Sequence, residues 1–154
     1  MRVGSLLAPS ERTPVEMILA SMNSAPSNGS IRICLAEDHA DARMVLKAML
    51  TRLGHQVVAD VSNGAELLQV AEQHELDLVI MDLDMPVMDG LAAADEIHAR
   101  RPVPIILLSG HPDAQHIVVE NEPITSCLMK PVTIDSLDRA IRDATGSSEK
   151  RRHA

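Results

Sequence analysis

The sequence predicts an α/β fold in which a parallel sheet of five strands is covered by helices on both faces. Five short apolar runs have the length of buried strands, at 31–36, 56–61, 76–81, 105–108 and 126–129. Apolar residues at helical spacing follow four of these runs. Successive runs begin roughly 20 to 30 residues apart, which suits the right-handed crossover connections that parallel strands need.

The first two units each consist of a strand, a polar loop and an amphipathic helix. Glu37 and Asp38 follow the first strand, and the helix after them ends at Gly54, a residue that commonly terminates helices. The apolar residues of this helix are Ala42, Val45, Leu46, Met49, Leu50 and Leu53. A Ser-Asn-Gly turn follows the second strand, and its helix ends near His74.

The third strand stops abruptly at a carboxylate, that of Asp82, and the third helix begins at Gly90. Leu78 to Met81 form an uninterrupted apolar run, which is typical of a strand covered on both faces. The fourth strand precedes a weakly periodic segment from His111 to Pro123, where a short fourth helix is expected. Thr133 can cap the last helix, which should end before Gly146.

The length of 154 residues fits one domain with a packed core and tails. We expect a disordered N-terminal arm at 1–30, a domain at 31–145 and a flexible tail at 146–154, because the two end segments cannot bury enough apolar surface to offset their conformational entropy. Met17 and Met22 are alternative start positions within that arm. No second domain follows the last helix, so the expected protein is a stand-alone module.

Composition argues against several classes of function. A net charge of −8 and the absence of Phe, Tyr and Trp disfavour nucleic-acid binding, which relies on basic surfaces and aromatic stacking. Cys34 and Cys127 lie inside apolar strands, which indicates reduced thiols rather than a disulfide. No apolar run has the length of a membrane helix or a signal peptide, so we expect no membrane insertion and a cytoplasmic location.

Polar side chains stand at the carboxyl ends of four predicted strands: Glu37 with Asp38, then Asp82, Ser109 and Lys130. In an open α/β sheet these positions meet at one crevice. The three carboxylates form a partial ligand shell for Mg²⁺, with Mn²⁺ as an alternative. Without a cation, carboxylates this close would repel and one would tend to take up a proton. The seven histidines show no metal-ligand spacing, so they are expected at the surface.

These residue types suit phosphoryl transfer to a carboxylate. A carboxylate nucleophile can accept a phosphoryl group while a divalent cation, an ammonium and a hydroxyl stabilise the phosphoryl oxygens. Asp82 fits the acceptor, Lys130 the ammonium and Ser109 the hydroxyl. The acyl phosphate so formed would add charge that can draw Ser109 and its loop inward.

Four motifs occur in a fixed order along the chain: Glu37-Asp38, the segment DLDMPVMDG at 82–90, Ser109-Gly110 and Lys130-Pro131. Together they resemble the receiver domain of bacterial two-component response regulators, over roughly residues 30 to 145. The resemblance implies a flavodoxin-like, doubly wound sheet with strand order 2-1-3-4-5.

The same resemblance implies roles for individual residues. Asp82 would be phosphorylated by a sensor histidine kinase or a histidine phosphotransfer protein. Glu37, Asp38, Asp82 and the backbone carbonyl of Asp84 would hold Mg²⁺. The phosphoryl group would contact three residues, Ser109, Gly110 and Lys130. Such a receiver is a signalling protein rather than an enzyme, acts on a downstream protein by contact or onward phosphotransfer, and is a monomer or a weak dimer.

The chain departs from the family pattern at three positions. Cys127 occupies the place, three residues before Lys130, where the family usually has an aromatic side chain that moves with the hydroxyl residue. Gly110 replaces the more common alanine and loosens its loop. Glu37 replaces the more frequent aspartate. In addition, we hypothesise that Asp84 and His111 flank the path of the hydrolytic water and set the lifetime of the phosphorylated state.

Two alternative functions remain open at this point. The missing aromatic would also suit a non-phosphorylated pseudoreceiver that acts as a binding module. The Asp82-Leu83-Asp84 sequence resembles the nucleophile motif of haloacid-dehalogenase-type phosphatases. That family keeps its nucleophile on its first strand and its metal-binding acids downstream, whereas Glu37 and Asp38 lie upstream of Asp82 here.

Overall fold

The computed structural model describes residues 30–85, 87–114, 116 and 123–153. Five parallel strands form one sheet in the order β2-β1-β3-β4-β5, as predicted. The strands are β1 (Arg32–Ala36), β2 (Gln56–Val61), β3 (Leu78–Asp82), β4 (Ile105–Ser109) and β5 (Ser126–Met129). The arm predicted at 1–30 lies outside the described residues except for its last position.

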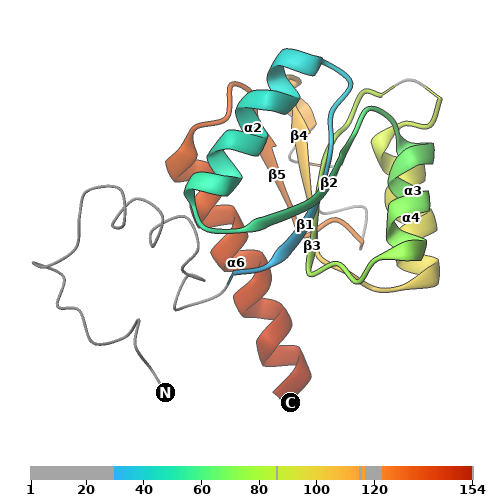
Figure 1. The fold of residues 1–154 in the computed structure, drawn as a ribbon, viewed down its shortest axis with the longest axis vertical. Helices are drawn as coiled ribbons and strands as arrows, with labels where there is room; N and C mark the ends of the chain where they lie inside the picture. Colours follow the sequence, from blue (N-terminus) through green and yellow to red (C-terminus); the bar gives the residue numbers. More distant parts are fainter. Residues whose placement is uncertain (1–29, 86, 115, 117–122, 154) are drawn as a thin grey trace, which may run out of the picture.

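Helices cover both faces of this sheet (Figure 1). They are α2 (Ala40–Arg52), α3 (Gly64–Gln73), α4 (Gly90–Arg100) and α6 (Ile134–His153). Helices α3 and α4 lie on one face, and α2 and α6 lie on the other. In the described part of the chain, no helix has the length and apolarity that a membrane crossing requires.

The central strands are buried on both sides, which explains their unbroken apolar sequences. All five residues of β3 and all five of β4 are buried. Along β3, Val79 and Met81 face the core beneath α3 and α4, whereas Leu78 and Ile80 face the core beneath α2 and α6. Apolar burial on both faces contributes most of the stabilisation of these strands.

Short polar side chains begin three of the helices. Asn63 accepts a hydrogen bond from the Glu66 backbone at the start of α3, and Asp89 does the same for Ala92 at the start of α4. The predicted cap at Thr133 is confirmed, since its Oγ1 accepts a hydrogen bond from the backbone nitrogen of Ser136 at 3.1 Å. Each such cap typically contributes about 1 kcal/mol.

The structure differs from expectation at two places. Helix α6 continues through Gly146 to His153, since a glycine inside a helix costs only about 1 kcal/mol and removes no hydrogen bond. The flexibility of that tail stays a prediction. Val45 is 53 % exposed rather than buried, because Leu46 and Leu50 make the inward face of α2. Of the expected fourth helix, the described residues include a 3₁₀ turn, Pro112–Ala114, and His116, which is helical. Residues 115 and 117–122 lie outside the described residues, so this helix stays a prediction.

Gly90 lies where no side chain fits, and this predicts a stability defect. A Cβ atom at this position would stand 2.7 Å from the backbone oxygen of Asp82 and 3.0 Å from the Cα of Leu83. We expect Gly90→Ala to lower the free energy of unfolding by about 1–3 kcal/mol, because backbone atoms must move to admit it. Urea unfolding followed by circular dichroism measures this. Gly110→Ala is the control, since nothing lies within 4 Å of its Cβ, and equal stabilities for the two variants would contradict the prediction.

Candidate functional site

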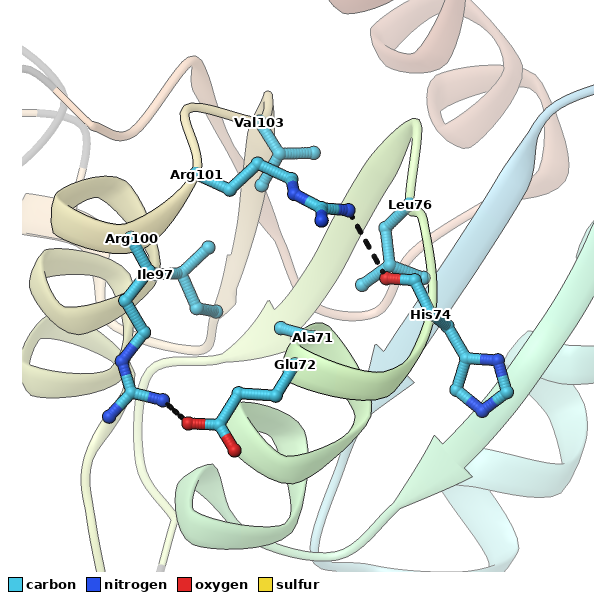
Figure 2. A pocket seen from close by; sticks show the side chains of 8 residues that line it. All are labelled: Ala71, Glu72, His74, Leu76, Ile97, Arg100, Arg101 and Val103. Atoms are coloured by element: carbon cyan, nitrogen blue, oxygen red, sulfur yellow. Dashed lines mark hydrogen bonds and ion pairs between the residues drawn. The ribbon is translucent and has the colours of Figure 1, made fainter.

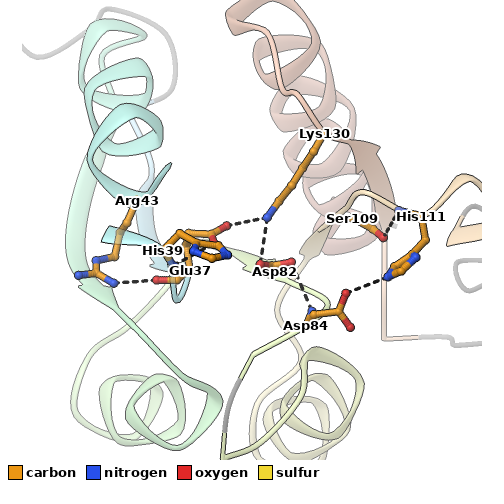
Figure 3. Close-up of polar contacts among 8 residues, drawn as sticks. All are labelled: Glu37, His39, Arg43, Asp82, Asp84, Ser109, His111 and Lys130. Atoms are coloured by element: carbon orange, nitrogen blue, oxygen red, sulfur yellow. Dashed lines mark hydrogen bonds and ion pairs between the residues drawn. The ribbon is translucent and has the colours of Figure 1, made fainter. Parts of the chain in front are cut away.

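Four loops meet at the carboxyl edge of the sheet and carry the predicted site residues (Figure 3). Glu37 follows β1, Asp82 ends β3, Ser109 ends β4 and Lys130 follows β5. Glu37 is completely buried, Asp82 is 5 % exposed and Ser109 is 1 % exposed. Burial of polar groups is costly unless they are paired, so the contacts of these side chains decide what the site can do.

Lys130 connects two of the acids. Its Nζ donates to Glu37 Oε2 at 3.0 Å and to Asp82 Oδ2 at 3.0 Å. Burial raises the pKa of Glu37, and the hydrogen bonds from Lys130 and His39 offset only part of that rise. Burial acts to lower the pKa of Lys130, but the hydrogen bonds to Asp82 and Glu37 outweigh it and leave that pKa raised. Lys130 is therefore held in its charged form, whereas burial destabilises the charged form of Glu37.

Glu37 is tethered at every polar atom. Its backbone nitrogen donates to the oxygen of Val61 at 3.0 Å, and its Oε1 accepts from the backbone nitrogen of His39 at 3.2 Å. Its backbone oxygen accepts from Arg43 Nη1 at 2.7 Å. Together with the Lys130 contact, these bonds fix both the backbone and the carboxylate of this residue.

Asp38 differs from Glu37 in its hydrogen bonding. Its Oδ1 is buried, and none of the described residues donates a hydrogen bond to it. A buried carboxylate oxygen without a donor is costly, and a cation would relieve that cost. Oxygen ligands of this kind suit Mg²⁺. The donor set at this edge of the sheet therefore fits a divalent cation.

The possible metal ligands are only partly assembled as the sequence predicts. Ligand atoms of Glu37, Asp38 and His39 lie within 4.8 Å of one another. Asp82 is not a member of this group, and it reaches Glu37 through the ammonium of Lys130. His39 was not predicted as a member of this group, although its position directly after the two acids could have indicated it. The ligand role of the Asp84 carbonyl stays a prediction.

Direct contacts beside Asp82 join two loops (Figure 3). Asp82 Oδ1 accepts from the backbone nitrogen of Asp84 at 3.3 Å. The carboxylate of Asp84, at Oδ2, lies 3.0 Å from His111 Nε2. The backbone nitrogen of His111 in turn donates to Ser109 Oγ at 3.0 Å. Asp84 and His111, predicted to flank the site, thus connect the loops after β3 and β4, with Gly110 exposed between Ser109 and His111.

Cys127 fills the position where an aromatic side chain was noted as missing. It lies in β5, is 7 % exposed and packs in the core cluster that contains Met81 and Leu107. Burial raises its pKa, and burial raises the pKa of Cys34 to about 12. The two cysteines form no disulfide, as predicted. Both are protonated thiols of the core at neutral pH.

The loop after β3 holds one residue in an unfavourable backbone conformation. Val87 has φ 71° and a side chain that is 83 % exposed. A left-handed backbone costs a residue with a Cβ roughly 1–2 kcal/mol, and a β-branched side chain adopts it rarely. Nothing in the sequence pattern indicates this strain, which lies five residues beyond Asp82.

A separate cavity of about 110 Å³ lies at the opposite edge of the sheet (Figure 2). Arg100 pairs with Glu72 at its rim, and Arg101 Nη1 lies 3.5 Å from the backbone oxygen of His74. Leu76 and Val103, which stand just before β3 and β4, form part of its wall. None of the predicted site residues lines this cavity, so it is not part of the carboxylate site.

The sequence and fold of this chain are similar to those of known proteins. Residues 33–142 match the sequence profile of the response regulator receiver domain. The chain is 40 % identical over 113 residues to the transcriptional regulatory protein PdtaR of Mycobacterium tuberculosis, covering 71 % of this chain and 54 % of that protein. It is 33 % identical over 112 residues to the chemotaxis protein CheY of Bacillus subtilis, covering 71 % and 93 %. The chain thus spans about half the length of PdtaR.

A similar solved structure is the receiver domain of a sensor histidine kinase from Pseudomonas aeruginosa PAO1. It superimposes with a TM-score of 0.67 at 33 % sequence identity, covering 77 % of this chain and 99 % of that domain. That crystal structure has a magnesium ion coordinated in its active site cleft.

Proposed function

The chain belongs to the response regulator receiver domain family, and from this premise we propose that Asp82 accepts a phosphoryl group in a Mg²⁺-dependent reaction. The donor is a sensor histidine kinase or a histidine phosphotransfer protein in the cytoplasm. The observation that carries the proposal is the shared ammonium of Lys130, which lies 3.0 Å from both Asp82 and Glu37. The phosphorylated chain acts as a signal and not as a turnover catalyst.

The chemistry follows from the contacts of Asp82. A carboxylate oxygen of Asp82 forms the new bond to phosphorus while the bond from phosphorus to the donor's nitrogen breaks, and that nitrogen keeps the electron pair. The Lys130 ammonium already donates a hydrogen bond to the acceptor carboxylate. A short movement would bring it to the negatively charged phosphoryl group. When bound, Mg²⁺ would neutralise phosphoryl oxygens, with Glu37, Asp38, Asp82 and the Asp84 carbonyl as its proposed ligands.

Ser109 and Gly110 complete the proposed phosphoryl contacts. The Ser109 Oγ accepts a hydrogen bond from the His111 backbone, which leaves its proton available for a phosphoryl oxygen. Turning toward that oxygen would weaken the bond to His111 and shift the loop that begins at exposed Gly110. We propose this loop as the readout, because a small buried thiol at Cys127 cannot make the large movement of an aromatic side chain.

The test is phosphorylation by acetyl phosphate followed by intact mass spectrometry. We expect one phosphoryl group per chain with Mg²⁺, a similar result with Mn²⁺, and none after addition of EDTA. Continuous release of p-nitrophenol from p-nitrophenyl phosphate would support a haloacid-dehalogenase-type phosphatase instead. A folded chain that takes no label under any of these conditions would be a pseudoreceiver.

The contact between Asp84 and His111 gives a prediction about the lifetime of the acyl phosphate. The pair joins two loops beside the acceptor carboxylate, so removing it opens the approach of water. We expect the Asp84→Ala/His111→Ala protein to lose its phosphoryl group roughly fivefold faster, the equivalent of about one hydrogen bond. The decay of label after removal of acetyl phosphate measures this. His98→Ala on α4 is the control, and an unchanged decay rate in the double variant would remove the hypothesis.

A further inference from the structure

The contact between Arg43 and the backbone of Glu37 is not used by the proposed chemistry. Arg43 is the fourth residue of α2, and its Nη1 donates to the backbone oxygen of Glu37 at 2.7 Å. That oxygen precedes the helix, so no helical nitrogen is available to it. The Arg43 guanidinium also lies beside Asp60 on β2, with Nε 3.8 Å from Oδ1. Figure 3 shows the contact with Glu37. With the ion pair to Asp60, Arg43 therefore links the acidic loop to the edge strand of the sheet.

We propose that Arg43 is a positioning residue for the metal-binding acids, a proposal that rests on the proposed function. The oxygen it holds belongs to the peptide between Glu37 and Asp38. Fixing the plane of that peptide places the Asp38 Cα and restricts the directions in which the Asp38 side chain can leave the backbone. Asp38 Oδ1 has no hydrogen-bond donor of its own among the described residues. Its orientation therefore depends on the backbone, and Arg43 holds that backbone.

Two effects of Arg43 on a bound cation have opposite signs. As a nearby positive charge, the guanidinium repels Mg²⁺, so its removal would strengthen Mg²⁺ binding. As a hydrogen-bond donor to the Glu37 carbonyl, the guanidinium orders the backbone that carries the ligand Asp38, so its removal would weaken Mg²⁺ binding. Partners that orient metal ligands typically contribute 10–100-fold to metal affinity. The direction of the change in affinity thus separates the two roles.

Lys47 provides a matched control one turn further along α2. Its Nζ pairs with the same aspartate, Asp60, at 2.8 Å from Oδ2. None of its hydrogen bonds or ion pairs in the described structure reaches Glu37 or Asp38. Lys47→Met and Arg43→Met each remove one positive charge that faces Asp60 and keep a similar apolar stem. They differ in whether the Glu37 carbonyl loses its donor.

The experiment titrates each folded protein with Mg²⁺ alone by isothermal calorimetry. We expect Arg43→Met to bind Mg²⁺ roughly tenfold more weakly than the wild type. Lys47→Met should bind as tightly as the wild type or slightly more tightly. Arg43→Lys, which restores one donor without the planar fork, should lie between Arg43→Met and the wild type. In acetyl phosphate labelling, the Mg²⁺ concentration for half-maximal rate should rise roughly tenfold in Arg43→Met, while the rate at saturating Mg²⁺ stays near that of the wild type.

Several outcomes would overturn the proposal. Unchanged or tighter Mg²⁺ binding in Arg43→Met would show that the contact orders nothing. Equal weakening in Lys47→Met, which keeps the contact between Arg43 and the Glu37 carbonyl, would show that loss of a partner for Asp60 weakens Mg²⁺ binding. If Arg43→Met does not fold, Arg43→Lys decides the question: weaker Mg²⁺ binding than the wild type supports positioning, and equal binding refutes it. A wild-type chain that binds no Mg²⁺ would instead overturn the proposed function.

Discussion

An Asp82→Asn protein will take no phosphoryl group from acetyl phosphate, whereas the wild type takes one per chain. The amide keeps the size of the carboxylate but lacks the negative oxygen that attacks phosphorus, so we expect a loss of more than roughly 1000-fold, which is complete on the assay's scale. The substitution leaves Lys130 paired with Glu37, at 3.0 Å. The fold should therefore survive, and circular dichroism checks that it does.

Asp95→Asn is the matched control for this result. It makes the same chemical change on an exposed side chain of α4, which is not among the proposed site residues. Labelling of Asp95→Asn should reach the stoichiometry of the wild type. If Asp82→Asn were labelled as fully as the wild type, another residue would be the acceptor and the proposed role of Asp82 would be wrong.

The second large effect is expected for Lys130→Met, which leaves completely buried Glu37 without its ammonium partner. Removing one member of a buried ion pair typically costs about 3–5 kcal/mol. The Lys130 side chain is 30 % exposed, so we expect the lower end, about 3 kcal/mol. Urea unfolding at neutral pH measures the loss. Lys47→Met, which removes a lysine that is 53 % exposed, should cost less than about 1 kcal/mol.

The pH dependence of this loss has a definite sign. The pKa of Glu37 is already raised in the folded state, mainly by burial, and the hydrogen bond from Lys130 acts to lower it. Without Lys130 that pKa rises further, so the folded variant binds a proton more tightly than its unfolded chain. Its free energy of unfolding then falls as pH rises above the ordinary range of a glutamate. The deficit should be larger at about pH 8 than at about pH 5, and a deficit independent of pH would contradict this explanation.

The five strands could be predicted because each contains a distinct apolar run, whereas their order in the sheet was predicted from the resemblance to receiver domains. Strand β3 is buried on both faces, so its sequence carries no polar residue until Asp82 at its end. The acids, Ser109 and Lys130 could be placed together for a related reason: parallel strands bring their carboxyl ends to one edge. Neither inference needs the details of side-chain packing.

The features that the sequence did not indicate depend on contacts between segments or on local backbone strain. The contact between Arg43 and the Glu37 carbonyl needs a long side chain to fold back over one turn of helix, which no periodicity encodes. The left-handed backbone of Val87 runs against the preference of that residue type. Exposed Val45 satisfies the helical spacing yet faces away from the sheet, because the position of α2 on the sheet selects Leu46 and Leu50.

The single ammonium of Lys130 has a thermodynamic consequence. The ammonium pairs with Asp82 and Glu37 at once. A negative charge that attracts the ammonium toward Asp82 therefore moves it away from Glu37, and the buried Glu37 carboxylate then needs another cation. Added negative charge at Asp82 should therefore tighten binding of a divalent cation near Glu37. Because such coupling is reciprocal, the cation must favour the phosphorylated form by the same factor. The cellular supply of that cation would then help set the equilibrium between the two signalling states.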